Sequence, residues 1–383
     1  MWRKGKHPLP VEQLLRGVQE RLQRARYGED RPGRTAARPP QQPPSGPGGA
    51  DYGHRQVQSH RFGEGDQAYW LFEPQAPRPP IAPLVIFLHG WGGVCPVGMS
   101  AWIDHLVRRG NLVLFPVYQS SLRTPATTML SNTLAAVKAA LQRLQSGVHV
   151  RPDLERVAAV GHSLGGALAA QVAAMAPRLG LPAPKALMPV APGRGLWALN
   201  RSLPPVDLRT IPTTTLLLVV VCEEDKNAGD YEGKVIFTQT PQIPLENKNF
   251  VVVRSDDHGT PPLVANHRSP TAVHPAYGAL STWTETDEKW AQVVKQVLGE
   301  GLPTANALHY YGYWKLFDAL MEAAFAQRHR EYALGNTPQQ RFMGRWSDGV
   351  PVRELLVITC PEQLASERLL EFRFRQASSS GGT

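Results

Sequence analysis

Six short runs of apolar residues recur between residues 84 and 253, and stretches with helical character separate them. Runs of this length without polar alternation are typical of strands buried on both faces, as in a parallel sheet. Their alternation with helices predicts a doubly wound α/β fold, because right-handed crossovers place helices on both faces of the sheet. The runs are Leu84–Leu88, Leu112–Val117, Val157–Val160, Ala186–Val190, Thr215–Val221 and Phe250–Val253.

Two antiparallel strands are predicted before the first of these runs. Arg55–Phe62 and Gln67–Phe72 flank the segment Gly63-Glu64-Gly65-Asp66, which is typical of a hairpin turn. Together with the six runs they predict a mostly parallel sheet of eight strands. The helices predicted around this sheet are Ser100–Arg109, Thr127–Leu144, Leu164–Met175, Tyr231–Thr240 and Thr284–Leu298.

The composition changes twice along the 383 residues. Residues 1–54 are basic and rich in Pro and Gly, and we expect this arm to be largely disordered. Residues 55–300 carry the strand and helix patterns of the α/β domain. Residues 301–383 are predicted to form a helical extension, rich in aromatic residues, followed by a tail.

The net charge of +9 is concentrated in the N-terminal arm. Residues 1–38 hold ten Lys and Arg against four Asp and Glu, so the rest of the chain is nearly balanced. This distribution argues against a nucleic-acid partner for the body of the protein. Residues 10–26 have the spacing of a basic amphipathic helix. Contact with a membrane surface or a partner is one interpretation of this helix, and a loosely packed helix is the other.

The sequence contains few indications of cellular location. No stretch of 18 uncharged apolar residues predicts a membrane-spanning helix, and no apolar segment follows the basic start as in a signal peptide. The default expectation is therefore the cytoplasm. Cys95, Cys222 and Cys360 are far apart and odd in number, so we expect buried or partly buried thiols rather than a disulfide framework or a zinc site.

The segment Gly161-His162-Ser163-Leu164-Gly165 lies between a predicted strand and a predicted helix. This G-x-S-x-G pattern is typical of a nucleophile elbow, in which a tight turn exposes the serine hydroxyl. The flanking glycines permit the strained backbone, since larger side chains would clash there. The position at a helix N-terminus favours nearby negative charge. We therefore predict that Ser163 is a catalytic nucleophile.

The number and order of the strands, with the elbow after the fifth, resemble the α/β-hydrolase superfamily over residues 55–300. The family places an H-G-x loop after the third strand, where this chain has His89-Gly90-Trp91. The resemblance implies that the amides of Trp91 and Leu164 stabilise an oxyanion. It also implies that His89 orders this loop. An ordinary Gly-rich turn is the alternative interpretation of the loop.

The resemblance implies an acid after Thr215–Val221 and a base after the last parallel strand. Asp225 is the predicted acid, with Glu223 and Glu224 as alternatives, since the family also accepts Glu. His258 is the predicted base, because it follows the strand and precedes a glycine. His267 and His274 compete with it, although neither follows a strand end. Ligand-like spacing among the three histidines is absent, so no metal is predicted there.

The predicted function is a serine hydrolase that cleaves carboxylic esters, of esterase or lipase type. The H-G-x loop resembles the dienelactone-hydrolase, chlorophyllase and polyester-hydrolase branch, although dienelactone hydrolases carry cysteine in place of Ser163. Trp91, His162 and Trp197 are expected to contact a small-molecule or lipid-like ester. The aromatic residues within 306–334 predict either a lid or a helix packed on the sheet. No cofactor is expected, and the protein is expected to be a monomer or dimer.

Three alternatives remain open at this point. An amidase or peptidase, or an acyltransferase, would use the same three catalytic side chains. A non-catalytic relative that binds a ligand or partner belongs to a different functional class. Such relatives lose a catalytic side chain or the glycines of the oxyanion loop, and this chain retains candidates for all of them.

Overall fold

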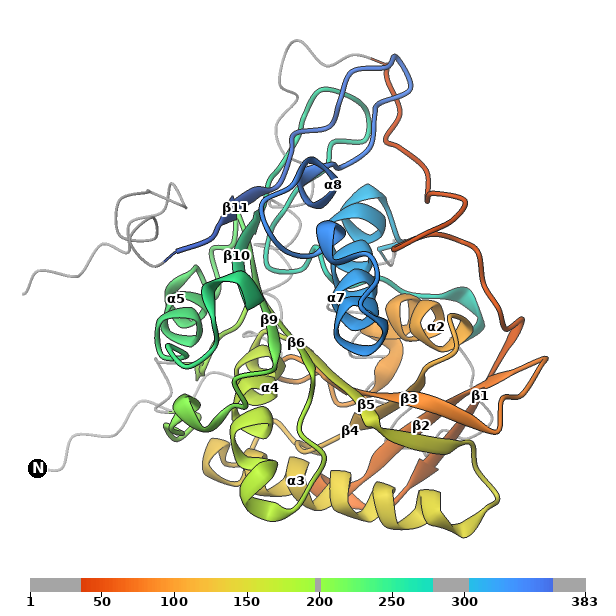
Figure 1. Ribbon diagram of the computed structural model, residues 1–383, viewed down its shortest axis with the longest axis vertical. Coiled ribbons are helices and arrows are strands. Elements are labelled where there is room, and N and C mark those ends of the chain that lie inside the picture. The colour runs from red at the N-terminus through yellow and green to blue at the C-terminus, as the bar shows by residue number, and fades with distance from the viewer. Residues whose placement is uncertain (1–35, 197–200, 278–302, 361–383) are drawn as a thin grey trace, which may run out of the picture.

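The computed structural model describes residues 36–196, 201–277 and 303–360. Its centre is a nine-stranded sheet with the order β1-β2-β4-β3-β5-β6-β9-β10-β11 (Figure 1). The six central strands β4, β3, β5, β6, β9 and β10 run parallel to one another. β1, β2 and β11 are antiparallel to their neighbours. The doubly wound, mostly parallel α/β fold predicted from the sequence is therefore confirmed.

All eight predicted strands are present, and a ninth joins them. The main sheet comprises β1 (Gln56–Phe62), β2 (Tyr69–Gln75), β3 (Ile81–Leu88), β4 (Leu112–Pro116), β5 (Arg151–His162), β6 (Ala186–Val190), β9 (Leu216–Cys222), β10 (Lys248–Val253) and β11 (Leu356–Ile358). The short strands β7 (Gly195–Leu196) and β8 (Arg201–Ser202) pair separately. The ninth strand was not predicted, because three residues at a sheet edge carry little sequence pattern.

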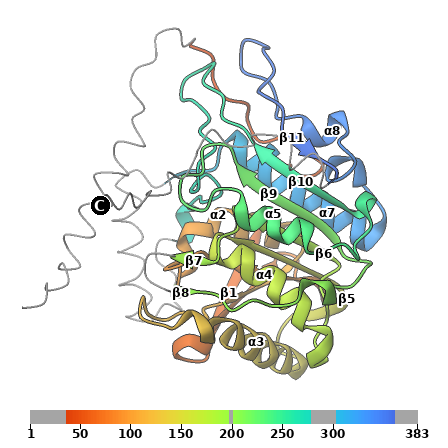
Figure 2. The ribbon, with the colours of Figure 1, turned by 90° about the vertical axis from the view of Figure 1, so that its left-hand side faces the viewer.

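Helices cover both faces of the sheet. Figure 2 shows one face, where α3, α4 and α5 lie in front of the strands, and α2 and α7 lie behind them. Four of these helices match the predicted ones closely, while the predicted helix at 284–298 lies outside the described residues. The helices are α2 (Ser100–Arg108), α3 (Ala126–Arg143), α4 (Leu164–Met175), α5 (Tyr231–Thr238), α7 (Lys315–Ala326) and the single turn α8 (Pro338–Arg341).

The sheet separates two apolar cores, and alternate residues of each strand face each core. In β10, Val251 and Val253 pack on the side of α2 and α7. Phe250 and Val252 pack on the side of α3, α4 and α5. Both faces of this strand are therefore dry, which explains why its sequence is a continuous apolar run.

The aromatic segment of the C-terminal extension packs on the sheet. Leu308–Trp314 forms a π-helical stretch that continues directly into α7. Tyr313, Trp314 and Phe317 are buried in the core between α2, α7 and the sheet. Of the two interpretations of this segment, the structure therefore supports packing on the sheet. With β11 added to the sheet edge, the described part of the extension belongs to the same folded unit.

The structure describes part of the N-terminal arm, residues 36–54, and the expectation for residues 1–54 as a whole stays a prediction. Residues 36–54 run along the outside of α2 and α7 (Figure 1). The Gly48 amide donates to Asp318 Oδ2 over 2.8 Å, and this oxygen also lies 2.9 Å from His105 Nε2 and 3.2 Å from Arg109 Nε. These polar contacts anchor the segment, although it lacks an apolar pattern. The predicted helix at 10–26 lies outside the described residues.

Two further features of the described residues concern helix length and the cysteines. In the described ranges, no helix is long and apolar enough to cross a membrane. None of the three cysteines forms a disulfide with another described residue; Cys95 and Cys222 are buried and Cys360 is partly buried, as expected.

The buried carboxylate of Asp318 should stabilise the fold through its contacts with the N-terminal segment. Asp318→Ala removes the partner of His105 and Arg109 inside the protein, and we expect the free energy of unfolding to fall by about 3 kcal/mol. Glu155→Ala removes an ion pair with Lys185 on the surface and should cost less than about 1 kcal/mol. Urea denaturation of both variants measures the difference. Equal losses would show that Asp318 is not an anchor.

Candidate functional site

Ser163 occupies a strained turn between β5 and α4. Its backbone has φ of 58° and ψ of −122°, a combination that few side-chain-bearing residues adopt. The turn is tight because a Cβ atom at Gly161 would overlap the carbonyl of Gly165, and one at Gly165 would overlap the carbonyls of Leu88 and His89. Both glycines are therefore required by close packing, and the strand–turn–helix context predicted for Ser163 is present.

Three side chains from distant parts of the chain form a hydrogen-bonded line. Ser163 Oγ lies 2.9 Å from His267 Nε2, and His267 Nδ1 lies 2.7 Å from Asp225 Oδ2. Ser163 follows β5, Asp225 follows β9, and His267 lies in the loop after β10. The carboxyl ends of parallel strands meet at one edge of the sheet, which brings the three together. An imidazole in this position accepts the serine proton while its other nitrogen donates to the carboxylate.

The prediction that His258 is the base was wrong. Its Nε2 lies 2.7 Å from Asp348 Oδ2, and the structure places His267 against Ser163 instead. The reason is an antiparallel bridge between Asp256 and Leu263, which turns this part of the loop toward the C-terminal segment. After the bridge the loop turns back toward the carboxyl ends of the strands, and His267 there contacts Ser163.

The sequence carried no signal that separates the histidines of this loop. The bridge depends on distant partners: Asp256 Oδ2 accepts from Trp346 Nε1 over 3.1 Å and from the Arg353 amide over 2.9 Å. The third candidate, His274, lies 3.8 Å from Asp104 through its Nε2. The packing of the C-terminal segment therefore directs His258 away from Ser163 and helps to decide which histidine reaches it.

Asp225 is buried and held as a carboxylate. Its Oδ1 accepts hydrogen bonds from the amides of Asn227 and Ala228, each over 2.8 Å, while Oδ2 faces His267. Burial alone would raise the pKa of Asp225, but the hydrogen bond and charge of His267 and the two amides bring the pKa below its ordinary value. The group is thus an anion that can orient and stabilise a positively charged imidazole.

The two glutamates considered as alternatives to Asp225 point elsewhere. Glu223 accepts from the Ser255 amide over 2.9 Å and pairs with Arg353 at 3.1 Å. Glu224 is exposed. Neither contacts His267, so Asp225 is the acid that the geometry favours.

The loop after β3 lies directly against the nucleophile. A Cβ atom at Gly90 would be 3.2 Å from Cβ of Ser163, so the backbone approaches the serine closely. The Gly92 amide donates to Gln119 Oε1 over 2.9 Å, and the Gly93 amide donates to the Gly90 carbonyl. Leu164 begins α4, so its amide has no acceptor within the helix. The role predicted for the amides of Trp91 and Leu164 is consistent with this arrangement and stays a prediction.

The side chain of His89 supports this loop through hydrogen bonds and ring stacking. Its ring stacks on Tyr118 at 4.0 Å, Nδ1 lies 2.7 Å from the Gly90 carbonyl, and Nε2 lies 2.7 Å from the Val117 carbonyl. Burial lowers the pKa of His89 to about 4, despite these two carbonyls. The neutral ring therefore donates to one of them and fixes the loop without taking part in proton transfer.

His162, which is predicted to contact substrate, supports the loop that carries His267. Its Nε2 donates to the main-chain carbonyl of His267 over 2.7 Å, and the two rings lie 4.9 Å apart. Burial and the nearby charge of His267 lower the pKa of His162 to about 3. The side chain is therefore a neutral donor that positions His267. Trp197, the other predicted substrate contact besides Trp91, lies outside the described residues.

A buried polar cluster supports the same loop from the π-helical segment. Tyr313 Oη lies 2.6 Å from Ser269 Oγ and 3.3 Å from Cys222 Sγ, and Ser269 Oγ donates to the Asn266 carbonyl. Burial raises the pKa of Cys222 to about 12, so this thiol stays protonated. The cluster ties both sides of His267 to β9 and to the helix, a role that the sequence did not indicate.

Comparison with known proteins agrees with this architecture. Residues 85–215 match a family model described as the alpha/beta hydrolase fold. The match includes the His89–Gly93 loop and the elbow, and it ends before Asp225 and His267. No match to the chain was found among curated proteins.

Acid should destabilise the site through its two buried neutral histidines. Their pKa values of about 4 and about 3 lie below the unfolded value of about 6.5. The unfolded chain therefore binds more protons, and the stability present above pH 6.5 is lost as the pH falls toward these values. His162→Gln keeps a donor for the His267 carbonyl and should reduce the slope of unfolding free energy between pH 4 and 6.5 by about 1.4 kcal/mol per pH unit.

Urea unfolding at several pH values measures this slope. Ser131→Ala, at an exposed position of α3, is the control and should leave the slope unchanged. If His162→Gln has the slope of the original protein, His162 is not a buried neutral group.

His258 and His267 should differ in their effect on Ser163. His267→Ala removes the group that accepts the serine proton, so labelling of Ser163 by a fluorophosphonate should slow by about 10²–10⁴-fold. His258→Ala should label at the original rate, because its ring pairs with Asp348. Rates of probe incorporation into the purified variants decide between them, and the reverse order would restore His258 as the base.

Proposed function

Since this chain is a member of the α/β-hydrolase superfamily, we propose that it is a serine hydrolase that cleaves carboxylic esters. The observation that carries the proposal is the continuous line from Ser163 Oγ through His267 to Asp225, with distances of 2.9 and 2.7 Å. A nucleophile, a base and an orienting acid in this arrangement form a catalytic triad. Ester cleavage is the activity typical of this architecture.

The first half of the reaction forms an acyl-enzyme. His267 Nε2 accepts the proton of Ser163 as Oγ attacks the acyl carbon of the ester. The tetrahedral intermediate then collapses, and the protonated His267 gives its proton to the departing alcohol. In the second half, His267 takes a proton from water as the water oxygen attacks the acyl carbon. The bond to Ser163 Oγ then breaks, His267 returns the proton to Oγ, and the acid is released.

Asp225 acts through His267. Its carboxylate keeps Nδ1 of the ring as the donor, so Nε2 is free to accept the serine proton. It also stabilises the imidazolium that each half-reaction forms. The buried position of Asp225 strengthens this interaction, because little water screens it.

The amides of Trp91 and Leu164 are the proposed oxyanion hole. Negative charge develops on the carbonyl oxygen of the substrate during both attacks, and fixed donors stabilise that charge without reorganising. Each donor of this kind contributes about 2.7–4 kcal/mol to the stability of the transition state. The close approach of Gly90 to Ser163 supports this assignment.

The proposed substrate is a small-molecule or lipid-like ester, and the mechanism uses no cofactor. Cleavage of amides and transfer of the acyl group to another alcohol would use the same side chains. A non-catalytic binding protein has less support, because His267 contacts both Ser163 and Asp225.

Hydrolysis of p-nitrophenyl acetate by the purified protein tests the proposal. Ser163→Ala should lower kcat/KM by at least about 10⁴-fold, since the nucleophile is lost. Ser131→Ala is the matched control, because it removes a hydroxyl from an exposed position of α3, and it should retain full activity. Turnover that Ser163→Ala leaves unchanged would refute the assignment.

The corresponding p-nitroanilide separates ester from amide cleavage. The ester should turn over faster if the proposed class is correct. Faster cleavage of the anilide would identify an amidase with the same triad.

A further inference from the structure

A second cluster of reactive side chains lies at the β1–β2 edge of the sheet. His60 on β1, Glu73 on β2 and His149 just before β5 turn their side chains toward one another. One ligand-type atom from each residue lies within 4.8 Å of the other two. None of these residues contacts Ser163, Asp225 or His267, so the mechanism proposed above does not use them.

The two carboxylate oxygens of Glu73 have different partners. Oε1 faces both imidazoles, at 2.5 Å from His149 Nδ1 and 3.4 Å from His60 Nε2. Oε2 accepts the Val150 amide over 2.8 Å and lies 3.4 Å from Arg78. Glu73 itself is 1% exposed. Oε2 therefore fixes the carboxylate, while Oε1 is presented to two nitrogens.

The spacing of these atoms is close to that of a zinc coordination shell. Zinc bonds to imidazole nitrogen and carboxylate oxygen at about 2.0–2.1 Å, so neighbouring ligands of a tetrahedral ion lie about 3.3 Å apart. His60 Nε2 already lies 3.4 Å from Glu73 Oε1. His149 Nδ1 would move away from Oε1 by about 0.8 Å, which a change in side-chain torsion provides.

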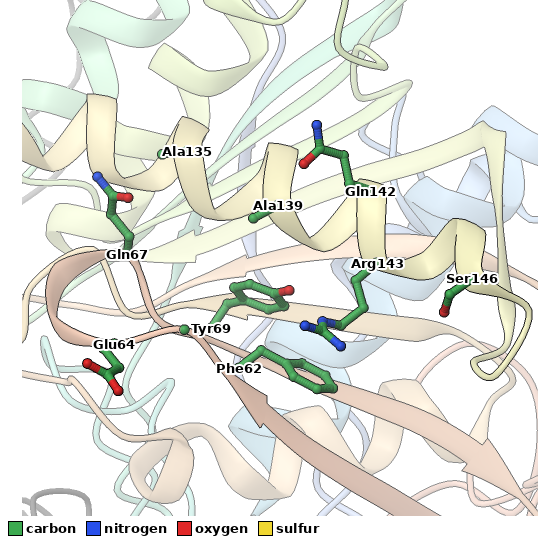
Figure 3. Close-up of a pocket in the computed structure, with 10 residues that line it drawn as sticks. Phe62, Glu64, Gln67, Tyr69, Ala135, Ala139, Gln142, Arg143 and Ser146 are labelled. Carbon is green, nitrogen blue, oxygen red and sulfur yellow. The ribbon is translucent and has the colours of Figure 1, made fainter.

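One aromatic side chain packs against both imidazoles. The ring of Phe62 stacks on His60 at 6.0 Å and meets His149 edge-on at 5.6 Å. Phe62 and Arg143 line a cavity of about 640 Å³ between the hairpin and α3. Figure 3 shows the ring of Phe62 beneath the side chain of Arg143. The guanidinium lies 4.0 Å from the centre of the Phe62 ring. The apolar ring fixes the imidazoles and limits the access of water to one side of the cluster.

We propose that His60, Glu73 and His149 bind a divalent transition-metal ion, with zinc as the preferred ion and water as the fourth ligand. Two imidazoles and one carboxylate are ligands that zinc prefers, and the partly exposed His60 leaves a path for entry. Arg78 lies beside Oε2 rather than Oε1, and its guanidinium also donates to the Val148 carbonyl, which holds it outside the cluster of ligand atoms. The ion would join β1, β2 and the start of β5, and its role is to stabilise this edge of the sheet.

Zinc binding to the full chain tests the proposal. The protein is treated with a chelator and dialysed against ZnCl₂, and metal content is measured by elemental analysis. The original protein should bind one zinc ion at this site, and its unfolding temperature should rise with zinc concentration. His60→Ala should weaken zinc binding by at least about 100-fold and abolish the thermal shift.

His258→Ala is the matched control, because both histidine side chains are 27% exposed and lie beside one carboxylate. It should bind zinc as the original protein does. His149→Gln is a second variant that can still donate to Glu73, so a loss of zinc without a loss of fold, checked by circular dichroism, supports the proposal. If the original protein binds no zinc, or if His60→Ala binds it equally well, the three residues form only a hydrogen-bonded network and the proposal fails.

Discussion

The contact between the first turn of α4 and the ends of β3 and β5 is the constraint on which the site depends. Gly165 packs against the carbonyls of Leu88 and His89, and this contact leaves Ser163 in its strained conformation. The same contact brings the loop after β3 against the serine. The Ser163 hydroxyl, the N-terminus of α4 and the backbone of the loop after β3 are thus held together by one packing interaction, which is why the turn tolerates no larger side chains.

The remaining parts of the site are held by residues that do not react. His162 binds the carbonyl of His267, and Tyr313 contacts Ser269 and Cys222 beside the same loop. Tyr313 comes from the π-helical segment before α7, and π-helical turns are frequent at functional sites. The C-terminal extension is therefore part of the proposed active site, although none of its described residues, 303–360, has a hydrogen bond to Ser163. The position of the base depends on this support from both sides.

The centre of the sheet and its β1–β2 edge carry different chemistry. At the centre, the carboxyl ends of parallel strands bring Ser163, Asp225 and His267 together, and we propose catalysis there. At the β1–β2 edge, His60, Glu73 and His149 join two antiparallel strands to the start of β5, where a bound ion would act on stability. The buried carboxylates illustrate the contrast: Asp225 contacts one imidazole, that of His267, whereas Glu73 gathers two imidazoles around one oxygen.

The sequence alone determined the sheet, the elbow and the position of Asp225, because apolar runs, glycines and strand ends are local features. It did not determine the base, since His258 and His267 occupy one loop and only the bridge from Asp256 to Leu263 separates them. That bridge is held by Trp346 and Arg353, which lie far away in the chain. The segment at 36–54 and the cluster around Glu73 likewise depend on contacts between distant residues, and such contacts leave no periodicity in the sequence.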